Sequence, residues 1–297
     1  MKNLWNTGTL FIKELDILDC AVYSEEHGII GTSWHVDVEV EGQLDENGFV
    51  YDFSHTKKLV KNTLKNTLDH ALILPSKNKN IDLSESGGTV NLSITTPEST
   101  WKYKAPKQAI YTVEDATVNA ETVSREAEKV ILKDLPDTVV SVKVRLYEEE
   151  VTDGSSIFRY THGLPHHKGL CQRLFHGHRS KIVVLKNDVK CLESEELIAN
   201  SWFNKNVHIA EPGQFKSKPW DVYTRGSKGE YAVLSYEAEE GYFEAEIPAE
   251  KVFIVEQATS IESIAQGLCK VLKNNSPESN FTVIPHEGIN KGGIARS

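Results

Sequence analysis

Histidines are concentrated in one short segment of this chain. Five of the eleven fall between residues 162 and 178, namely His162, His166, His167, His176 and His178. His176 and His178 stand two residues apart where a predicted strand begins, so both imidazoles point from the same face of that strand. With a third imidazole they form a three-ligand zinc site whose fourth position stays open, as catalytic zinc requires. We choose His162 as the third ligand, because residues 158–162 alternate as a strand able to pair beside the first.

A polar loop that carries surface histidines is the plain alternative to this metal site. Five histidines with a cysteine among them, in a chain that is otherwise poor in histidine, favour the metal. Imidazole ligands favour Zn²⁺, but geometry rather than affinity decides between metals, so Fe²⁺ and Ni²⁺ remain open.

Cys171 lies five residues before His176 in a basic segment. Residues 159–190 hold seven lysines and arginines against a single acidic residue, Asp188. We expect this positive charge to lower the pKa of the Cys171 thiol and to attract an anionic ligand. The alternative is that Cys171 is a fourth zinc ligand, which would close the site and make it structural. The chain has four irregularly spaced cysteines, which predicts reduced thiols rather than a disulfide framework.

The overall composition is that of an ordinary globular protein of about two domains. The 297 residues include 33 basic and 43 acidic side chains, and the net charge of -10 excludes broad electrostatic binding to nucleic acid or to an anionic membrane. No apolar run approaches the ~18 residues of a membrane span. Lys13, Glu14 and Asp16 interrupt the apolar N-terminal stretch, which argues against a signal peptide and predicts a cytoplasmic protein.

The sequence repeats itself. Residues 90–117 and 232–259 match at a constant offset of 142 positions, with seven identities in 28 positions. In both copies an alternating stretch is followed by an amphipathic helix and then by an apolar strand that ends in a glutamate. Each half therefore indicates the order β-β-α-β-β-α-β. This order predicts an α+β protein in which helices lie on one face of antiparallel sheets.

The elements that position the histidines follow from this repeat. The first half contains an alternating strand over residues 34–44 and a helix with Leu59, Val60, Thr63, Leu64 and Leu68 on one face. The second half contains a strand over residues 180–188 and a helix over 194–204. The polar segment 150–156 divides the chain into domains 1–150 and 157–297, and residues 211–230 form an insertion without clear structure.

The cluster of functional residue types resembles a known family, the 6-pyruvoyl-tetrahydropterin and 6-carboxy-tetrahydropterin synthases of the T-fold superfamily. The resemblance rests on an F-x-x-x-H strand (Phe158–His162), then Cys171, then the motif HGH at 176–178. Weaker marks are Asp52-Phe53 before the first long helix, Asp69-His70 after it, and closing strands that end in glutamate. The resemblance extends over nearly the whole chain, once per half, and implies two tandem T-fold domains.

The two halves depart from the family pattern in complementary ways. The first half has Gly31-Thr32-Ser33 in place of HGH, which implies that it binds no zinc, but it keeps Asp69-His70. The second half keeps the histidines and Cys171 but has Val207-His208 where Asp-His is expected. Family active sites are built across subunit interfaces, so the two halves together could assemble one complete site, within one chain or between chains. The resemblance also implies a homo-oligomer, whose sheets close into a barrel and hide their edges.

The resemblance implies the following roles. The substrate is a dihydropterin, 7,8-dihydroneopterin triphosphate, whose side-chain hydroxyls the zinc would bind. Cys171, as thiolate, takes a proton from the side-chain carbon, and His70, oriented by Asp69, is the partnering acid or base. Without the resemblance, the residues themselves favour a helix C-terminal cap at Asp69-His70, where a histidine is favourable. Glu287, with Glu148 as second choice, would bind the guanidine-like edge of the pterin.

The expected product is 6-carboxy-tetrahydropterin, an intermediate toward queuosine and other 7-deazapurines, or alternatively a 6-pyruvoyl product formed with elimination of triphosphate. Two other readings of the residues remain. One is a different zinc enzyme, such as a hydrolase, in which Cys171 takes no part. The other is a zinc-binding scaffold without catalysis.

Overall fold

The computed structural model describes residues 6–297, so residues 1–5 of the N-terminal stretch lie outside the described part. The first half of the chain contains β1 (Thr7–Ser24), β2 (Gly28–Gln43), α1 (Phe53–Thr67), β3 (Leu72–Pro75), β4 (Ile81–Ser86), β5 (Thr89–Thr95), β6 (Thr100–Pro106), β7 (Ile110–Val113), α2 (Ala120–Asp134) and β8 (Val139–Tyr147). The second half contains β9 (Ser156–His162), β10 (His176–Lys186), β11 (Val189–Lys190), α3 (Leu192–Glu196), β12 (Asn206–Ala210), β13 (Tyr231–Ala238), β14 (Gly241–Pro248), β15 (Val252–Ile254), α4 (Ile261–Asn275), β16 (Phe281–Pro285) and β17 (Ala295–Arg296). None of the helices within residues 6–297 is long and apolar enough to cross a lipid bilayer.

The strands form three sheets, and the fold is mixed α+β. Two sheets have the orders β7-β3-β1-β2-β8 and β15-β12-β9-β10-β16-β17, and the third has the order β13-β14-β6-β5-β4. The expectation of purely antiparallel sheets is wrong for the first two. In them β3 and β7 run parallel to β1, and β12 and β15 run parallel to β9. Between two parallel strands of the same sheet the chain passes through a helix or through strands of the third sheet. Crossover connections of this kind produce parallel pairs.

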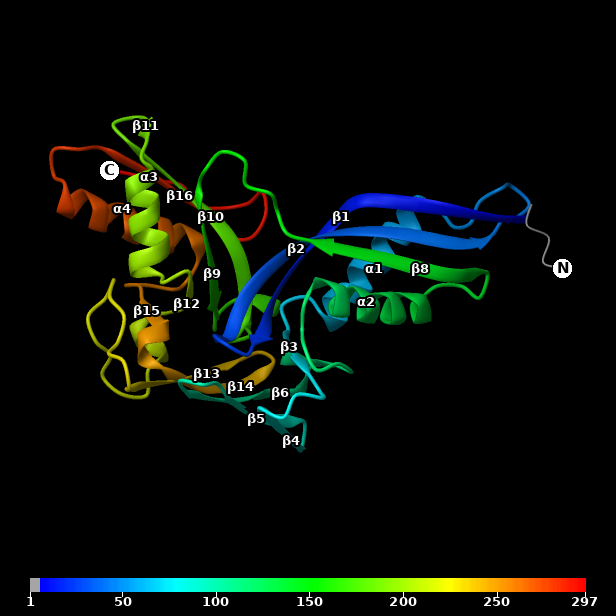
Figure 1. Ribbon diagram of the computed structural model, residues 1–297, viewed down its shortest axis with the longest axis horizontal. Coiled ribbons are helices and arrows are strands. Elements are labelled where there is room, and N and C mark those ends of the chain that lie inside the picture. The colour runs from blue at the N-terminus through cyan, green and yellow to red at the C-terminus, as the bar shows by residue number, and fades with distance from the viewer. Residues whose placement is uncertain (1–5) are drawn as a thin grey trace.

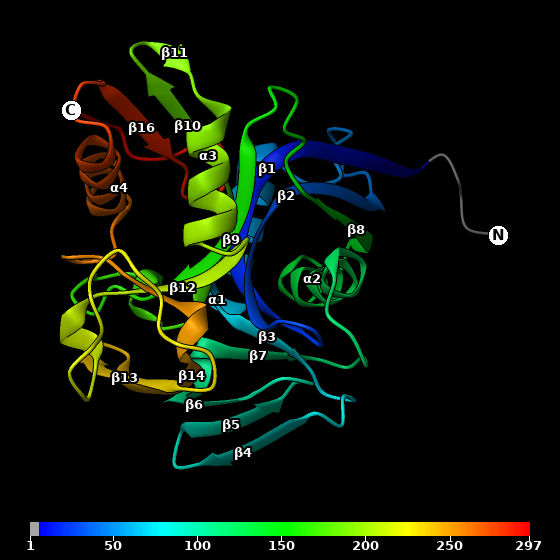
Figure 2. The same ribbon diagram turned by 60° about the vertical axis from the view of Figure 1, so that its left-hand side comes forward.

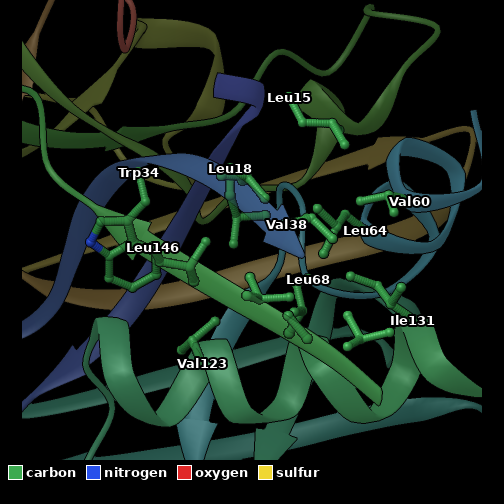
Figure 3. Close-up of a cluster of buried hydrophobic side chains, with 14 of the residues drawn as sticks. Leu15, Leu18, Trp34, Val38, Val60, Leu64, Leu68, Val123, Ile131 and Leu146 are labelled. Carbon is green, nitrogen blue, oxygen red and sulfur yellow. The ribbon is translucent and has the colours of Figure 1, made fainter. Parts of the chain in front are cut away.

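Helices α1 and α2 cover one face of the first sheet. Figure 3 shows side chains from β1, β2 and β8 meeting side chains of α1 and α2 in one continuous cluster. Alternation supplies the strand side of this cluster, since Trp34, Val36, Val38 and Val40 are all buried. The helical spacing predicted for α1 is confirmed, with Val60 and Leu64 on the buried face. This packing fixes the end of α1, where the chain turns toward the second half.

The third sheet joins the two halves of the chain. Figures 1 and 2 show β13 and β14 continuing the sheet formed by β4, β5 and β6 below the other two sheets. In the ladder between β6 and β14, Tyr103 lies opposite Ala245, and Lys102 lies opposite Glu246. Tyr103 and Ala245 also correspond to each other at the offset of 142 positions seen in the sequence. The two halves therefore meet at equivalent points of their strands.

The long hairpins of the two halves are built in the same register. Ala21 lies opposite Gly31 in the β1–β2 hairpin, and Thr161 lies opposite Gly177 in the β9–β10 hairpin. Positions of the two hairpins can therefore be matched one to one. The counterparts of His162, His176 and His178 are Val22, Ile30 and Thr32, so HGH corresponds to residues 30–32, and its predicted match to residues 31–33 is wrong by one residue. The hairpins differ in the connection between their strands, which spans residues 25–27 in the first and residues 163–175 in the second.

The two hairpins cross where two glycines meet. A Cβ atom on Gly31 would lie 2.0 Å from the Tyr160 carbonyl oxygen, and one on Gly177 would lie 2.5 Å from the Gly31 Cα atom. The obstructing atoms belong to the main chain, so no rotamer change relieves the contact. Glycine at both positions lets the backbones approach closely, which brings β1 against the histidine-bearing strands.

We expect Gly31→Ala to destabilise the protein strongly. The added methyl group must push two strands apart, and overpacking of this kind costs about 3 kcal/mol of the free energy of unfolding. Denaturant titration followed by circular dichroism measures the loss. Gly213→Ala is the matched control, because no heavy atom lies within 4 Å of the added Cβ there. Equal stability of the two variants would contradict the close crossing.

Candidate active site

Strands β9 and β10 bring the three predicted histidines together. His176 lies opposite His162, and His178 lies opposite Tyr160 on the antiparallel ladder. The ring centroids of His162 and His176 are 4.1 Å apart, and the ring of His178 is 5.4 Å from each of them. All three side chains are buried. The predicted strand pairing and the shared face are therefore present in the structure.

Two of these imidazoles are oriented by hydrogen bonds through Nδ1, and the third lies beside a carboxylate. His162 Nδ1 lies 2.8 Å from the carbonyl oxygen of Thr259, and His176 Nδ1 lies 3.0 Å from that of Arg173. A carbonyl oxygen only accepts hydrogen bonds, so these Nδ1 atoms carry the proton and the Nε2 atoms carry the lone pair. His178 Nδ1 lies 3.3 Å from Oδ1 of Asp19.

The three Nε2 atoms are buried and have no hydrogen-bond partner among residues 6–297. One nitrogen from each ring lies within 4.8 Å of the other two. Burial also lowers the pKa values of His162 and His176 well below 6.5, which keeps their rings neutral. Unpartnered lone pairs are costly in the interior unless a cation satisfies them. These donors fit a divalent metal that accepts imidazole nitrogen.

Asp19 is the outer partner of this group, and sequence reasoning did not find it. The carboxylate is buried, accepts a hydrogen bond from the Ser33 hydroxyl, and lies 2.8 Å from the ammonium group of Lys291. Burial raises the pKa of Asp19, but His178 and Lys291 outweigh it and hold the pKa below its usual range. A carboxylate behind a ligating histidine fixes the ring and increases its basicity.

Asp69 and His70 lie beside the three histidines in the same chain. They follow α1, where His70 adopts a left-handed conformation (φ 56°) and donates its backbone N–H to the carbonyl oxygen of Asp19. His70 Nδ1 lies 3.0 Å from the Asp69 carboxylate, and the ring stacks on that of His176 with 5.2 Å between centroids. The structure therefore places the Asp69–His70 pair next to the histidines of the same chain.

Cys171 lies close to His70 and His176 rather than to all three histidines of the triad. It lies in the connection between β9 and β10, and its sulfur, one nitrogen of His70 and one nitrogen of His176 are within 4.8 Å of one another. Burial lowers the pKa of His70, but the contacts with Asp69 and Cys171 raise it more strongly, to about 10. His70 is therefore a cation at neutral pH, next to a thiol.

The basic segment around Cys171 does not form an open positive surface. Acidic side chains from elsewhere pair with five of its seven cations, namely Arg159, Arg173, Arg179, Lys181 and Lys190. Arg173, for example, binds both carboxylate oxygens of Glu240 at 2.8 and 2.9 Å. The expectation of a positive island was wrong, because carboxylates outside the segment, at residues 148–153 and 240, neutralise most of its charge.

The two candidate pterin-binding glutamates occupy different places. Glu287 lies at the histidine cluster, with Oε1 3.9 Å from His162 Nε2. Glu148 binds two guanidinium groups instead, with Oε1 on Arg159 and Oε2 2.9 Å from Arg179. Along β10, Arg179 points to the opposite side from His178. The structure therefore brings Glu287 to the cluster and leaves Glu148 outside it.

The sequence comparison misplaced the segment that corresponds to Asp69-His70. Leu72 pairs with Ala21, and His208 pairs with Thr161, the counterpart of Ala21. His208 is therefore the counterpart of Leu72, and the segment that matches 69–70 is 205–206. His208 is instead a buried neighbour of the site, whose Nδ1 lies 2.9 Å from the Thr161 hydroxyl and whose pKa burial lowers to about 3.

Three contributors to the site carried little or no sequence signal. Asp19 stands within an alternating strand, and Lys291 lies in the C-terminal segment beyond β16, where no pattern marks either of them. Thr259 could have been noticed, because it is identical to Thr117 in the internal repeat. Its carbonyl oxygen orients His162, which makes it part of the support for the triad.

Comparisons with known proteins match part of this chain to one family. Residues 24–156 match the family model described as 6-pyruvoyl tetrahydropterin synthase. A protein of Pyrococcus abyssi, provisionally named 6-carboxy-5,6,7,8-tetrahydropterin synthase, is 26% identical over 140 residues, which are 46% of this chain and 81% of the relative. A protein of Pyrococcus horikoshii with the same provisional name is 27% identical over 140 residues, which are again 46% of this chain and 81% of the relative.

Solved structures of 6-pyruvoyl tetrahydropterin synthase also match part of the chain. The Plasmodium vivax enzyme is 19% identical, with a TM-score of 0.40 over 50% of this chain and 94% of that chain. The Plasmodium falciparum enzyme is 16% identical, with a TM-score of 0.39 over 48% of this chain and 91% of that chain. The family model and the curated relatives show that part of this chain is similar to the 6-pyruvoyl tetrahydropterin synthase family.

Proposed function

We propose that this protein is a zinc-dependent lyase that converts 7,8-dihydroneopterin triphosphate into 6-carboxy-tetrahydropterin, a step toward queuosine and related 7-deazapurines. The observation that carries the proposal is the contact between the histidine triad and the Asp69–His70–Cys171 group within one chain. The names of the curated relatives support the carboxy product. We further propose that residues 1–150 and 157–297 are two tandem T-fold domains, and that copies of the chain associate through sheet edges into a closed barrel.

His162, His176 and His178 would hold the zinc ion through their unpartnered Nε2 atoms. When bound, the metal supplies Lewis-acid polarisation of substrate oxygen atoms. The protein prepares the ligands in advance, since Thr259, Arg173 and Asp19 fix the orientation of the three rings. Ligands held in this way need little rearrangement on binding.

Cys171 and His70 divide the proton transfers between them. Cys171, as thiolate, would take the proton from the substrate side-chain carbon next to the ring. His70 is protonated at neutral pH and would donate its proton to the developing oxyanion, while Asp69 holds the ring through Nδ1. Glu287 would accept two hydrogen bonds from the amino-pyrimidinone edge of the pterin.

Product identification tests the function directly. Purified protein with zinc is incubated with 7,8-dihydroneopterin triphosphate, and the products are identified by mass spectrometry. We expect 6-carboxy-tetrahydropterin together with loss of the two-carbon side-chain fragment. A 6-pyruvoyl product with release of triphosphate would overturn the product assignment but retain the lyase. Unchanged substrate in the presence of bound zinc would contradict the proposed function and favour a scaffold.

Asp69→Asn should move the alkaline limb of the pH profile of kcat to lower pH. The pKa of His70 is raised above 6.5 to about 10, so its protonated form contributes stability below pH 6.5 that is lost as the pH rises through about 10. Without the Asp69 charge the proton leaves at lower pH, and the general acid is lost earlier. Steady-state rates between pH 6 and 10.5 measure the shift. Asp82→Asn on the exposed strand β4 is the control, and an unmoved limb in Asp69→Asn would exclude His70 as the acid.

A further inference from the structure

A second cavity lies at the place that corresponds to the histidine site in the other half. Its volume is about 540 Å³, within the range typical of small-molecule sites, and it is lined by residues of both halves. Ile30, the counterpart of His176, forms part of its wall. Lys205 and Asn206, the counterparts of Asp69 and His70, form another part. The cavity thus repeats the architecture of the first site with different chemistry.

The lining of this cavity excludes the chemistry of the first site. The triad positions carry Val22, Ile30 and Thr32, which offer no imidazole. The short connection between β1 and β2 offers no cysteine, because it contains only residues 25–27. Neither the metal ligands nor the proposed acid and base are present.

The cavity is strongly cationic instead. It is lined by four cations and one carboxylate, namely Arg159, Arg179, Lys205, Lys251 and Glu148. Both oxygens of Glu148 are occupied by the guanidinium groups of Arg159 and Arg179. Within residues 6–297, Lys205 and Lys251 have no carboxylate at ion-pair distance. Two uncompensated ammonium groups in a protein of net charge -10 indicate a place built to receive an anion.

Asn206 is a buried polar residue of the cavity lining. Its side chain is 8% exposed, and its Oδ1 atom is buried without a hydrogen-bond partner in the described part of the chain. Its amide nitrogen lies 3.4 Å from the carbonyl oxygen of Ile29, which fixes the side chain at the cavity wall. A buried acceptor of this kind is costly unless a donor reaches it.

We propose that this cavity is a second, non-catalytic binding site for a phosphorylated small molecule. Lys205 and Lys251 bind the phosphate as point charges. Arg159 and Arg179 keep Glu148 neutralised, so the only carboxylate of the cavity lining does not repel the anion. The site stands independently of the lyase function and of any bound zinc.

Pyrophosphate is the probe for this site. Isothermal titration calorimetry compares the unaltered protein with the double variant Lys205→Asn, Lys251→Gln. Asparagine is chosen because residue 205 has a φ of 58°, a conformation that asparagine tolerates. We expect the dissociation constant for pyrophosphate to rise about tenfold or more, since both ammonium contacts are lost. Binding to the unaltered protein should also weaken as salt is added.

Two further variants make the result decisive. Lys57→Gln with Lys58→Gln removes the same charge from the exposed face of α1 and should change the dissociation constant less than about twofold. His176→Ala disrupts the histidine site and should leave pyrophosphate binding in place. Loss of binding in His176→Ala, or unchanged binding in the Lys205 and Lys251 variant, would overturn the proposal. Metal content is measured in every sample, so that removal of the metal by pyrophosphate is recognised.

Discussion

Replacement of Cys171 by alanine should lower kcat by about 10²–10⁴-fold, the contribution typical of a positioned general base. Cys171 is placed to remove a proton because its sulfur lies beside the cationic His70. The zinc content should stay unchanged, because the histidine triad provides three ligands without it. Single-turnover kinetics and metal analysis of the same preparation measure both quantities.

Cys191→Ala is the matched control, because Cys191 is also a free, partly exposed thiol but lies before α3, next to Ser194. It should retain the full rate. A Cys171→Ala protein that turns over at the original rate would support a zinc enzyme of another kind, in which the thiol takes no part. A Cys171→Ala protein that loses its zinc would instead make the thiol a structural ligand.

Mixing two impaired variants tests where the composite site forms. Asp69→Asn and Cys171→Ala chains, combined after dissociation and reassembly, should recover no activity beyond that of the separate variants. Asp69, His70 and Cys171 of the same chain already face one another, so neither variant can supply an intact group to the other. Recovery of activity would show that sites are shared between chains.

His176→Ala should weaken zinc binding by more than about 100-fold. Loss of an outer-shell partner alone typically costs 10–100-fold in metal affinity, and His176 is a direct member of both groups of candidate ligands. Competition with a chromophoric chelator measures the affinity. His166→Ala, from the same histidine-rich segment but exposed, should bind zinc as the unaltered protein does. Equal affinities of the two variants would rule out the triad as the metal site.

Removal of the metal separates a catalytic site from a structural one. We expect chelation to abolish turnover while thermal unfolding shifts by only a few degrees, because the three rings are already held by Thr259, Arg173 and Asp19. A structural metal would contribute much of the folding free energy, so its removal would unfold the protein. Unfolding on chelation would therefore favour the scaffold over the lyase.

The sequence was sufficient for the features that depend on local spacing. The i, i+2 pair His176 and His178 predicted a shared strand face, and the strand ending at His162 pairs with it as expected. The apolar positions of α1 were likewise predicted from their helical spacing. In each case the determining interaction lies within a few residues, so the pattern is visible along the chain.

The features that failed depend on partners distant in the sequence. The positive island was an error of this kind, because Arg173 is paired by Glu240, 67 residues away. The prediction that His208 is the counterpart of His70 was wrong. The two sequences are shifted by two residues at this point, and only the strand registers reveal the shift. Asp19 was missed since its role arises from the glycine crossing of two hairpins, and no local pattern encodes that contact.

The unequal hairpin connections have a practical consequence for protein engineering. Counterpart positions are matched throughout the two hairpins, and the connections differ by ten residues, three against thirteen. The longer connection could replace residues 25–27, with histidines introduced at positions 22, 30 and 32 and Asp-His at 205–206. This would place the same set of candidate groups in the first hairpin and its surroundings. The first hairpin can therefore serve as a scaffold in which the groups needed for the reaction are introduced one at a time.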